Sequence, residues 1–251
     1  MARYFIQLSY FGKHYHGWQV QENEACTVQQ VVQDKLSILL QEKIDITGCG
    51  RTDTGVHAED YFAHFDSVKE GLGDDDKYLY RFNKILPEDI AIHKLFRVKD
   101  NAHARFDATS RTYQYRIHKN KNAFLSNFSL HRYGDLNIEA MNHAAALLLN
   151  TKDFTSFSKT NTQVKTNNCK VSEAFWFTAG EDKFIFKITA DRFLRNMVRA
   201  IVGTLLEVGS NKLSPEEFKT IIESKNRSNA GLSVAAHGLY LTRVEYGDVR
   251  C

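Results

Sequence analysis

The order of strands and helices limits the fold of this chain more than any other feature of its sequence. Apolar and polar residues alternate at 3–10, which predicts a strand, and a T-x-x-Q capping box at 27–30 opens an amphipathic helix. In the second half, alternating residues at 171–177 and 183–189 predict a hairpin across the turn at 179–182. Strands joined in this way, without strict alternation of strand and helix, favour an α+β fold with mostly antiparallel sheets.

The remaining predicted elements fill both halves of the chain. Strands are expected at 44–47, 57–65, 90–98, 113–118 and 239–246. Helices are expected from Asp74 or Asp75 to Leu86, from Asn137 to Leu149, from Phe193 to Val208, and after a cap at 214–217. We place a domain boundary near 100–110, which gives an N-terminal half of residues 1–105 and a C-terminal half of residues 106–251.

The composition narrows the class of protein. With 251 residues, of which 43% are hydrophobic, the chain can bury one large core or two small ones. The net charge is only +3, so any basic surface must be local. No apolar run approaches the roughly twenty residues of a membrane span, and the N-terminus lacks the pattern of a signal peptide. We therefore expect a cytoplasmic protein without a membrane segment.

Neither the cysteines nor the histidines predict a metal site. The four cysteines lie far apart without a C-x-x-C pair, which argues against a zinc ribbon or a disulfide scaffold and fits a reducing cytosol. The ten histidines show neither H-E-x-x-H nor the Cys/His spacing of metal ligands. We expect no bound metal.

The stretch GCGRTDTGVHAED at 48–60 is the strongest candidate for chemistry. It holds three glycines within eight residues, and glycine is used where the backbone needs positive φ or a close approach. A dinucleotide fingerprint would need a glycine where Asp53 stands, and no G-K-[ST] follows, so the stretch is not a phosphate-binding loop. The glycines therefore surround one carboxylate.

Three interpretations of Asp53 follow from the residues alone. Asp53-Thr54-Gly55 spells the triplet of aspartic proteases, but those enzymes pair two carboxylates, and the triplet occurs once here. An aspartate can also stabilise a turn by local hydrogen bonds. Equally, Arg51 lies two positions away and can keep a catalytic carboxylate ionised. The turn and the catalytic interpretations both stay open at this point.

Two segments combine positive charge with aromatic or polar residues. Between Asp107 and Asp135 there is no acid, while five cations alternate with five aromatic residues. These residues are Arg111, Tyr113, Tyr115, Arg116, Lys119, Lys121, Phe124, Phe128, Arg132 and Tyr133. A second acid-free patch holds Lys159, Lys165 and Lys170. Cations for phosphates and aromatics for unstacked bases are what an RNA surface requires, although a solvated strand face over core aromatics gives the same pattern.

The helix expected at 193–208 carries a possible arginine ridge. Its apolar residues Leu194, Val198, Ile201 and Leu205 fall on one face. Arg192, Arg195 and Arg199 fall opposite at spacings of three and four. Such a ridge could meet phosphates or the Asp53 carboxylate, and the alternative is a solvated helix face.

Several segments together resemble one family. The matching residues, in chain order, are Gly50-Arg51-Thr52-Asp53-x-Gly55-Val56-His57-Ala58, Asn83-x-x-Leu86-Pro87, Ala104-Arg105-Phe106, Arg111-x-Tyr113-x-Tyr115, Asp153-Phe154-x-Ser156-Phe157, Phe193-Leu194-x-x-Met197-Val198-Arg199, Ile201-Val202-Gly203 and Gly238-Leu239-Tyr240-Leu241. They span nearly the whole chain, which resembles the tRNA pseudouridine synthase A family. The sequence departs from the family pattern at Thr54, Tyr61-Phe62, Asn150-Thr151 and Ala235. None of these is an expected catalytic group, so we expect the departures to affect the details of substrate recognition and not the activity.

The resemblance implies a fold and an activity. It implies two similar α+β halves whose mostly antiparallel sheets form one continuous sheet flanked by helices, with a positively charged active-site cleft between the halves. The N-terminal half would carry the catalytic Asp loop, and the C-terminal half the tyrosine, the arginine helix and the G-L-Y-L strand. The activity would be isomerisation of uridine to pseudouridine in the anticodon stem-loop of tRNA, at positions 38 to 40, by a homodimer that needs no cofactor and no metal.

The resemblance also assigns roles to single residues. Asp53 would be the catalytic nucleophile, Tyr113 would stack on the target base and serve in proton transfer, and Arg199 would pair with Asp53. Arg51 would help to extrude the uridine, since a base in a stem must be flipped out. The other residues expected to bind substrate are Lys119, Lys121, Arg195, Leu239 and Leu241. A non-catalytic RNA-binding protein is the second hypothesis, and an aspartic-type hydrolase is the third.

Overall fold

The structure of the protein is a computed structural model that describes residues 1–21, 26–74, 76–159 and 165–249. The chain forms two compact units. Unit 1 comprises Met1–Thr109 and Leu241–Cys251, and unit 2 comprises Ser110–Tyr240. This division differs from the predicted halves at the C-terminus, because residues 241–251 belong with unit 1. Asp75, one of the two residues considered as a helix cap, and Cys251 fall outside the described residues.

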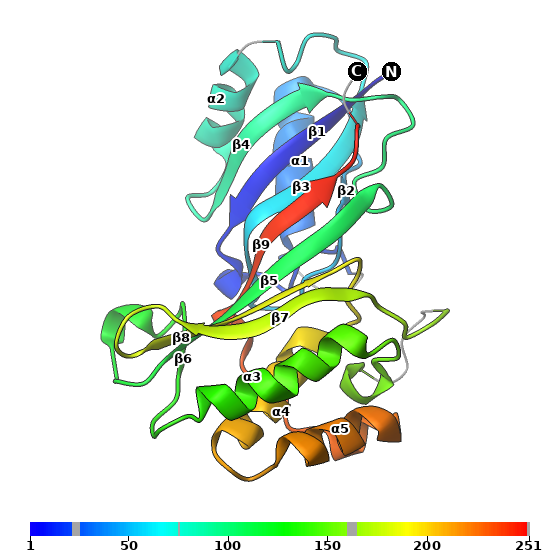
Figure 1. Cartoon of the computed structure of the whole chain (residues 1–251). Helices are drawn as coiled ribbons and strands as arrows, with labels where there is room; N and C mark the ends of the chain where they lie inside the picture. The colour runs from blue at the N-terminus through cyan, green and yellow to red at the C-terminus, as the bar shows by residue number, and fades with distance from the viewer. Residues whose placement is uncertain (22–25, 75, 160–164, 250–251) are drawn as a thin grey trace. The chain divides into compact units, whose positions relative to one another are not determined.

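Unit 1 is built around antiparallel strands (Figure 1). They follow the order β4-β1-β3-β9, and β2 pairs with β3. The bounds are β1 (Ala2–Tyr10), β2 (Thr47–Gly48), β3 (His57–Ser67), β4 (Ile90–Arg97) and β9 (Leu239–Tyr246), of which residues 241–246 belong to unit 1. Because β9 is the neighbour of β3, the last strand of the chain joins the sheet that the first strand begins. A boundary drawn along the sequence could not foresee this return.

The helices of unit 1 begin where the sequence predicts. They are α1 (Val28–Leu40) and α2 (Asp76–Ile85), with a 3₁₀ turn, η1, at Gly12–His14. The Thr27 side chain accepts a hydrogen bond from the Gln30 amide, which confirms the predicted N-cap. The strand predicted at 44–47 instead starts at Thr47. The amides of Ile44 and Ile46 donate to the Ser37 hydroxyl and the Gln33 side chain of α1, so they are not available to a strand partner.

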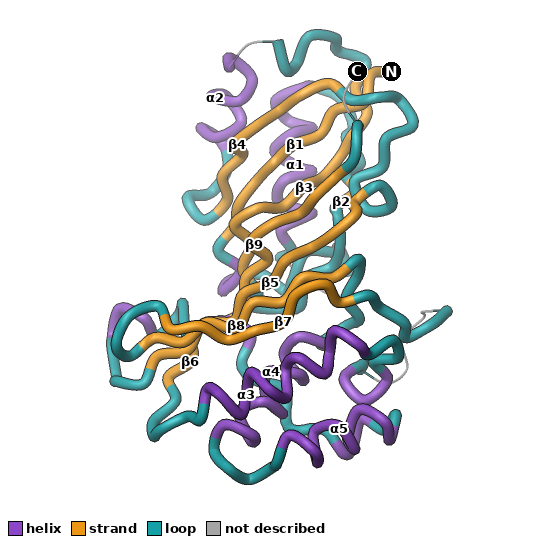
Figure 2. The backbone as a smooth tube through the Cα atoms, in the orientation of Figure 1, coloured by secondary structure: helices purple, strands orange, loops and turns teal. Residues whose placement is uncertain are grey.

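Unit 2 combines an antiparallel ladder with three helices (Figure 2). Its strands are β5 (Ala108–His118), of which residues 110–118 belong to unit 2, β6 (Leu130–His131), β7 (Val171–Thr178) and β8 (Lys183–Ala190). Their order is β5-β8-β7, with β6 parallel to β5. Its α-helices are α3 (Ile138–Ala146), α4 (Met197–Gly209) and α5 (Pro215–Ser224). Its 3₁₀ turns are η2 (Ala123–Leu125), η3 (Leu147–Asn150), η4 (Thr155–Phe157), η5 (Arg227–Asn229) and η6 (Ala236–Gly238). The predicted hairpin and the Ser214 capping box of α5 are confirmed.

The predicted arginine ridge is wrong, because α4 starts at Met197 instead of Phe193. Asn196 adopts a left-handed conformation at φ 66°, which a helix interior does not accommodate, and its side chain bonds the Ser233 hydroxyl. Arg192 and Arg195 therefore precede the helix, and only Arg199 lies on it.

The predicted α+β class with mostly antiparallel strands is confirmed. Among the helices that the structure describes, none combines the length and the apolar character that crossing a membrane requires.

Candidate active site

The loop that carries Asp53 connects β2 to β3 in unit 1 and is bonded to the segment after β1. The Trp18 amide donates to the Thr52 carbonyl at 3.3 Å, and the Gly55 amide donates to the Tyr15 carbonyl at 3.3 Å. These bonds hold the backbone immediately before and shortly after Asp53. The carboxylate therefore projects from a backbone whose position is fixed on both sides.

Two glycines outside the motif allow this contact. A Cβ at Gly12 would lie 1.9 Å from the Val56 carbonyl oxygen, and a Cβ at Gly17 would lie 2.4 Å from the Thr52 carbonyl oxygen. Gly17 also has φ +83°, as Gly55 within the loop has φ +78°. The glycines of the motif are visible in the sequence as a cluster, whereas the role of these two was not predicted. Their signal was a pair of glycines five residues apart, directly after a predicted strand.

Aromatic residues support the Asp53 loop. Tyr61 stacks on Trp18 with ring centroids 4.1 Å apart, and its hydroxyl donates to the Gly50 carbonyl. A Cβ at Gly48 would lie 2.1 Å from that hydroxyl, so Gly48 makes room for the tyrosine. The Tyr10 hydroxyl pairs with the Thr52 hydroxyl at 2.9 Å. Tyr61, one of the departures from the family pattern, is thus a support of the Asp53 loop.

Asp53 itself is half-buried and begins a tight turn. The Val56 amide donates to the Asp53 backbone carbonyl at 3.1 Å. This bond closes the turn through the main chain. Arg51, two residues earlier, is exposed.

Tyr113 lies in unit 2, in strand β5, opposite Ile188 of β8. Its half-buried ring meets Phe193 edge to face, with centroids 5.1 Å apart and an interplanar angle of 85°. This contact fixes the plane of the Tyr113 ring within the unit.

Arg199 is the third residue of α4, where it is tied to the segment that leads into β9. Its Nε donates to the Val234 carbonyl at 2.7 Å, and the Val234 amide donates to the Arg199 carbonyl at 3.2 Å. A Cβ at Gly203 would lie 1.8 Å from the Leu232 carbonyl oxygen, so this glycine lets the segment approach the helix. A guanidinium has five N–H donors, and the one at Nε is bonded to Val234 here.

The Y-x-Y and G-L-Y-L motifs share a structural role that was not predicted from the sequence. The buried Tyr115 hydroxyl donates to the Ala235 carbonyl at 2.8 Å, and burial raises the pKa of this phenol. A Cβ at Gly238 would lie 2.8 Å from the Tyr115 ring. Ala235 has φ −56°, a value that proline also adopts, and either residue offers a backbone carbonyl. The departure at Ala235 therefore preserves the contact.

The basic segment, which we define as residues 119–134 of unit 2, is largely exposed. Phe124 and Tyr133 are 88% and 82% exposed, and Lys121 is exposed beside them. Lys119 forms an ion pair with Asp135, just beyond the acid-free window, and this hydrogen bond raises the pKa of the ammonium. An exposed pair of this kind contributes little to stability, so it leaves Lys119 able to exchange partners.

The other residues expected to bind substrate differ in exposure. Arg195 is exposed, and its carbonyl accepts a hydrogen bond from the Lys159 amide at 3.1 Å. Leu239 and Leu241 are both buried, at 5% and 2% exposure. The structure describes Asp53 within unit 1 and Tyr113 and Arg199 within unit 2. Their joint action stays a prediction.

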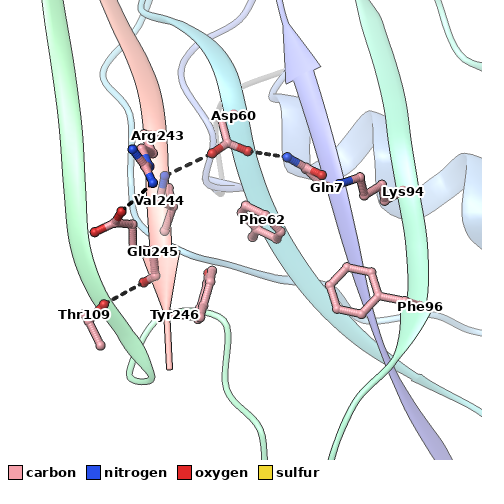
Figure 3. Close-up of a pocket in the computed structure, with 10 residues that line it drawn as sticks. All are labelled: Gln7, Asp60, Phe62, Lys94, Phe96, Thr109, Arg243, Val244, Glu245 and Tyr246. Atoms are coloured by element: carbon pink, nitrogen blue, oxygen red, sulfur yellow. Dashed lines mark hydrogen bonds and ion pairs between the residues drawn. The ribbon is translucent and has the colours of Figure 1, made fainter. Parts of the chain in front are cut away.

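A pocket of about 450 Å³ lies on the sheet of unit 1, away from the helices (Figure 3). Its lining residues are Gln7, Asp60, Phe62, Lys94, Phe96, Thr109, Arg243, Val244, Glu245 and Tyr246. Figure 3 shows Asp60 between Gln7 and the Val244 amide, which donate to it at 2.7 and 3.1 Å. Arg243 pairs with Glu245 at 2.8 Å. The pocket holds two acids and two bases, so it does not favour an anion.

Across the residues that the structure covers, no group of three or more His, Cys, Asp or Glu side chains is arranged to hold a metal ion.

Comparison with known sequences gives the class of the protein. The model of a family described as tRNA pseudouridine synthase matches residues 7–107 and 144–247. The chain belongs to this family. Curated relatives named tRNA pseudouridine synthase A are 51% identical over 98% of both chains in Porphyromonas gingivalis and 50% identical over 98% of this chain and 97% of the relative in Bacteroides fragilis. A relative of the same name in Clostridium acetobutylicum is 42% identical over 96% of this chain and 98% of its own length.

Proposed function

We propose that this protein isomerises uridine to pseudouridine in the anticodon stem-loop of tRNA, with Asp53 as the nucleophile. The observation that carries the proposal is similarity over almost the full length of relatives named tRNA pseudouridine synthase A. The rigid support of the Asp53 loop adds to it, because catalytic groups must be held in their productive geometry. Family membership makes a non-catalytic RNA-binding protein the weaker hypothesis.

The reaction moves one bond and one proton. The C1′–N1 glycosidic bond breaks, the freed uracil turns, and a C1′–C5 bond forms, while the proton on C5 is lost and N1 gains one. Atoms and electrons balance without an oxidant or a cofactor. A carboxylate can form a transient covalent adduct that divides this exchange into two steps. Arg199 would keep Asp53 ionised through a charge-assisted hydrogen bond.

Other residues would place the base. The Tyr113 ring, held by Phe193, would stack on the uracil and serve in the proton transfer. Arg51 is exposed beside Asp53 in the sequence and would take the place of the extruded uridine in the stem. Leu239 and Leu241 would bound the base-binding site with apolar surface.

The basic segment would bind the tRNA backbone. Lys119 and Lys121 would meet phosphates, as would Arg195, while exposed rings such as Phe124 can receive unstacked bases. The homodimer that the resemblance implies is part of the proposal, and sedimentation over a range of concentrations tests it.

We place the activity in the cytoplasm. The wide spacing of the four cysteines, without a C-x-x-C pair, supports this assignment because it fits a reducing compartment. Fractionation of cells that express a tagged chain tests this assignment.

The deciding experiment is the substitution Asp53→Asn. Asparagine keeps the size of the side chain, and the bond that closes the turn uses the Asp53 carbonyl, so the loop is expected to fold as before. Pseudouridine formation should fall by roughly 10⁴-fold or more, as expected when a catalytic nucleophile is removed. Affinity for tRNA should be retained, since phosphate contacts elsewhere supply most of it. Pseudouridine is mapped in the treated tRNA by carbodiimide modification, and affinity is measured by filter binding.

Asp153→Asn is the matched control. The Asp153 carboxylate accepts hydrogen bonds from the Thr155 amide and hydroxyl at 3.0 and 2.6 Å, which makes it a turn aspartate. Its substitution should cost stability and leave pseudouridine formation in place. Substantial pseudouridine from folded Asp53→Asn protein would refute the catalytic assignment. Wild-type protein that binds tRNA without forming pseudouridine would favour the non-catalytic hypothesis.

A further inference from the structure

The loop from Ala102 to Asp107 of unit 1 presents an exposed aromatic ring. Phe106 is 74% exposed, and the guanidinium of the exposed Arg105 lies 5.8 Å from the centre of its ring. A single exposed apolar side chain is common on protein surfaces and needs no function. The hydrogen bonding of this loop, however, is that of a segment held in one conformation.

The tip of the loop is fixed by His103. Its Nδ1 accepts hydrogen bonds from the amides of Arg105 at 3.1 Å and Phe106 at 3.3 Å. Its own amide donates to the Asp107 carboxylate at 2.7 Å, and its carbonyl accepts from the Asp107 amide at 3.0 Å. Burial is the largest effect on His103, and it lowers the pKa of the imidazole. This direction agrees with the geometry, because an imidazole that accepts at Nδ1 carries no proton there.

The base of the loop is fixed to the sheet. The Ala104 amide donates to His64 Nδ1 at 3.1 Å, and the Ala104 carbonyl accepts from the Tyr246 hydroxyl at 2.6 Å. Arg3 Nη1 donates to the Ala102 carbonyl at 3.0 Å. Ala102 and Ala104 are both buried. Three strands, β1, β3 and β9, thus hold the loop that carries Phe106.

We propose that Phe106 and Arg105 form a tRNA contact of unit 1, in which an unstacked base lies on the Phe106 ring and Arg105 meets the phosphate backbone. The inference rests on the proposed function, which supplies the RNA. A cation beside an exposed ring is the combination that receives single-stranded bases. A loop whose backbone is already held in one conformation loses little entropy on binding. The acid of the loop, Asp107, is bonded to the His103 amide.

The neighbouring pocket is a weaker candidate for this contact. Tyr246 lines the pocket and also holds the loop. The charges of the pocket are balanced, however, and Phe62 and Tyr246 pack against each other with centroids 5.1 Å apart. The loop is the part of this surface that presents a ring to a ligand.

Steady-state kinetics on tRNA tests the proposal. The Phe106→Ala variant should lower kcat/KM by roughly 5- to 150-fold, which is the range that about 1–3 kcal/mol of base stacking corresponds to. The loss should appear in KM, with kcat at saturating tRNA within about twofold of wild type. The Phe106→Tyr variant keeps the ring and should restore KM. Tyr80→Ala, which removes a 64% exposed ring from α2, is the matched control and should leave KM unchanged.

The outcomes separate the two proposals. If wild-type protein forms pseudouridine and Phe106→Ala has an unchanged KM, the loop contact is refuted and the proposed function stands. If wild-type protein forms no pseudouridine, the proposed function fails, and tRNA affinity of Phe106→Ala measured by filter binding still decides the contact. A changed kcat with an unchanged KM would also overturn it, because stacking on a remote nucleotide acts through binding.

A fluorescence measurement gives a second readout that does not depend on turnover. The two native tryptophans, Trp18 and Trp176, are only 2% and 3% exposed, so the Phe106→Trp variant adds an indole that acrylamide can reach. Addition of tRNA to this variant should reduce acrylamide quenching several-fold. The Tyr80→Trp variant should remain equally quenched with and without tRNA. Equal quenching of the Phe106→Trp variant in both conditions would contradict the proposal.

His103 should act as a positioning residue. The His103→Leu variant removes the acceptor for two amides and should raise KM as Phe106→Ala does. The His103→Asn variant keeps an acceptor that can reach amides two and three residues on, so it should restore most of the affinity. A His103→Leu variant with wild-type KM would show that the fixed loop is not needed for binding.

Discussion

The Asp53 loop and the basic segment differ in how tightly the surrounding structure holds them. The loop is bonded to the chain between β1 and α1, rests on stacked Trp18 and Tyr61, and tolerates no side chain at Gly17. The basic segment exposes Lys121 and Phe124 and is held through contacts such as the surface ion pair of Lys119. A nucleophile needs sub-ångström placement, whereas phosphate binding tolerates movement because charge acts over distance. The contrast predicts which substitutions change turnover and which change affinity.

Among the substitutions that probe this contrast without removing the nucleophile, the largest effect is expected from Gly17→Ala. The added Cβ would lie 2.4 Å from the Thr52 carbonyl oxygen at a residue with φ +83°, so the backbone next to Asp53 must shift. A displacement of about 1 Å costs on the order of 100-fold in kcat. Affinity for tRNA should change less than about threefold. Single-turnover rates and filter binding measure the two quantities.

Gly134→Ala is the control in the basic segment. Gly134 has φ +95°, and among the described atoms none lies within 4 Å of a Cβ placed there. The backbone strain is similar, but no carbonyl is pushed aside. Equal losses of kcat in the two variants would break the comparison, because strain alone would then explain both.

The double substitution Lys119→Glu with Lys121→Glu should act on affinity alone. Loss of two phosphate contacts should weaken tRNA binding by about 10- to 100-fold and flatten the plot of log affinity against log salt by roughly 1.5 to 2. At saturating tRNA, kcat should stay near wild type. Lys212→Glu with Lys219→Glu, on exposed residues of the same unit, is the charge-matched control. An unchanged salt slope would remove the basic segment from the RNA surface.

Acid should affect the sheet of unit 1 and the basic segment differently. Burial, followed by Arg3 and His103, lowers the pKa of His64 in β3 to about 4. The neutral imidazole is favoured in the folded state, so stability is complete above the unfolded pKa of about 6.5 and falls as the pH drops from there toward 4. Between pH 7 and pH 5, protonation of His64 in the unfolded chain should lower the free energy of unfolding by about 2 kcal/mol. The hydrogen bond to Asp135 raises the pKa of Lys119 in the basic segment, so that ammonium stays charged throughout.

Urea denaturation at both pH values measures the effect. His64→Asn keeps a small acceptor for the Ala104 amide and should reduce the loss of stability between pH 7 and pH 5 by about 2 kcal/mol relative to wild type. An identical loss in both proteins would show that His64 is not the group that titrates.

The smallest effect is expected from Tyr61→Phe. The stacking on Trp18 is kept, and the hydrogen bond to the Gly50 carbonyl is lost, which costs about 1 kcal/mol of stability. The kcat should fall a few-fold, because Gly50 precedes Asp53 by three residues. Tyr4→Phe loses a similar bond to the Lys69 carbonyl and should cost similar stability without a change in kcat. Equal kcat values in the two variants would show that the hydroxyl does not position the loop.

Local sequence determined most elements of this protein. The strand at β1, the Thr27 cap of α1, the hairpin of β7 and β8, and the capping box of α5 depend on residues within a few positions of each other. The motif around Asp53 likewise identifies the candidate catalytic loop from the sequence alone, because its glycine spacing and its flanking arginine are both local features.

Tertiary contacts decided the rest. Arg192 and Arg195 lie outside α4 because Asn196 turns left-handed, with its side chain bonded to Ser233, 37 residues away. The ion pair between Lys119 and Asp135 depends on the path of the loop between them, which the sequence pattern does not predict.

Strand pairing over long sequence separations places residues 241–251 in unit 1. It also brings Gly12 and Gly17 against the backbone of the Asp53 loop. Propensity and periodicity report what a residue does with its neighbours in sequence. Which backbone a glycine must accommodate is fixed only when distant segments pack, and that packing adds to the local turn bond in holding the Asp53 loop.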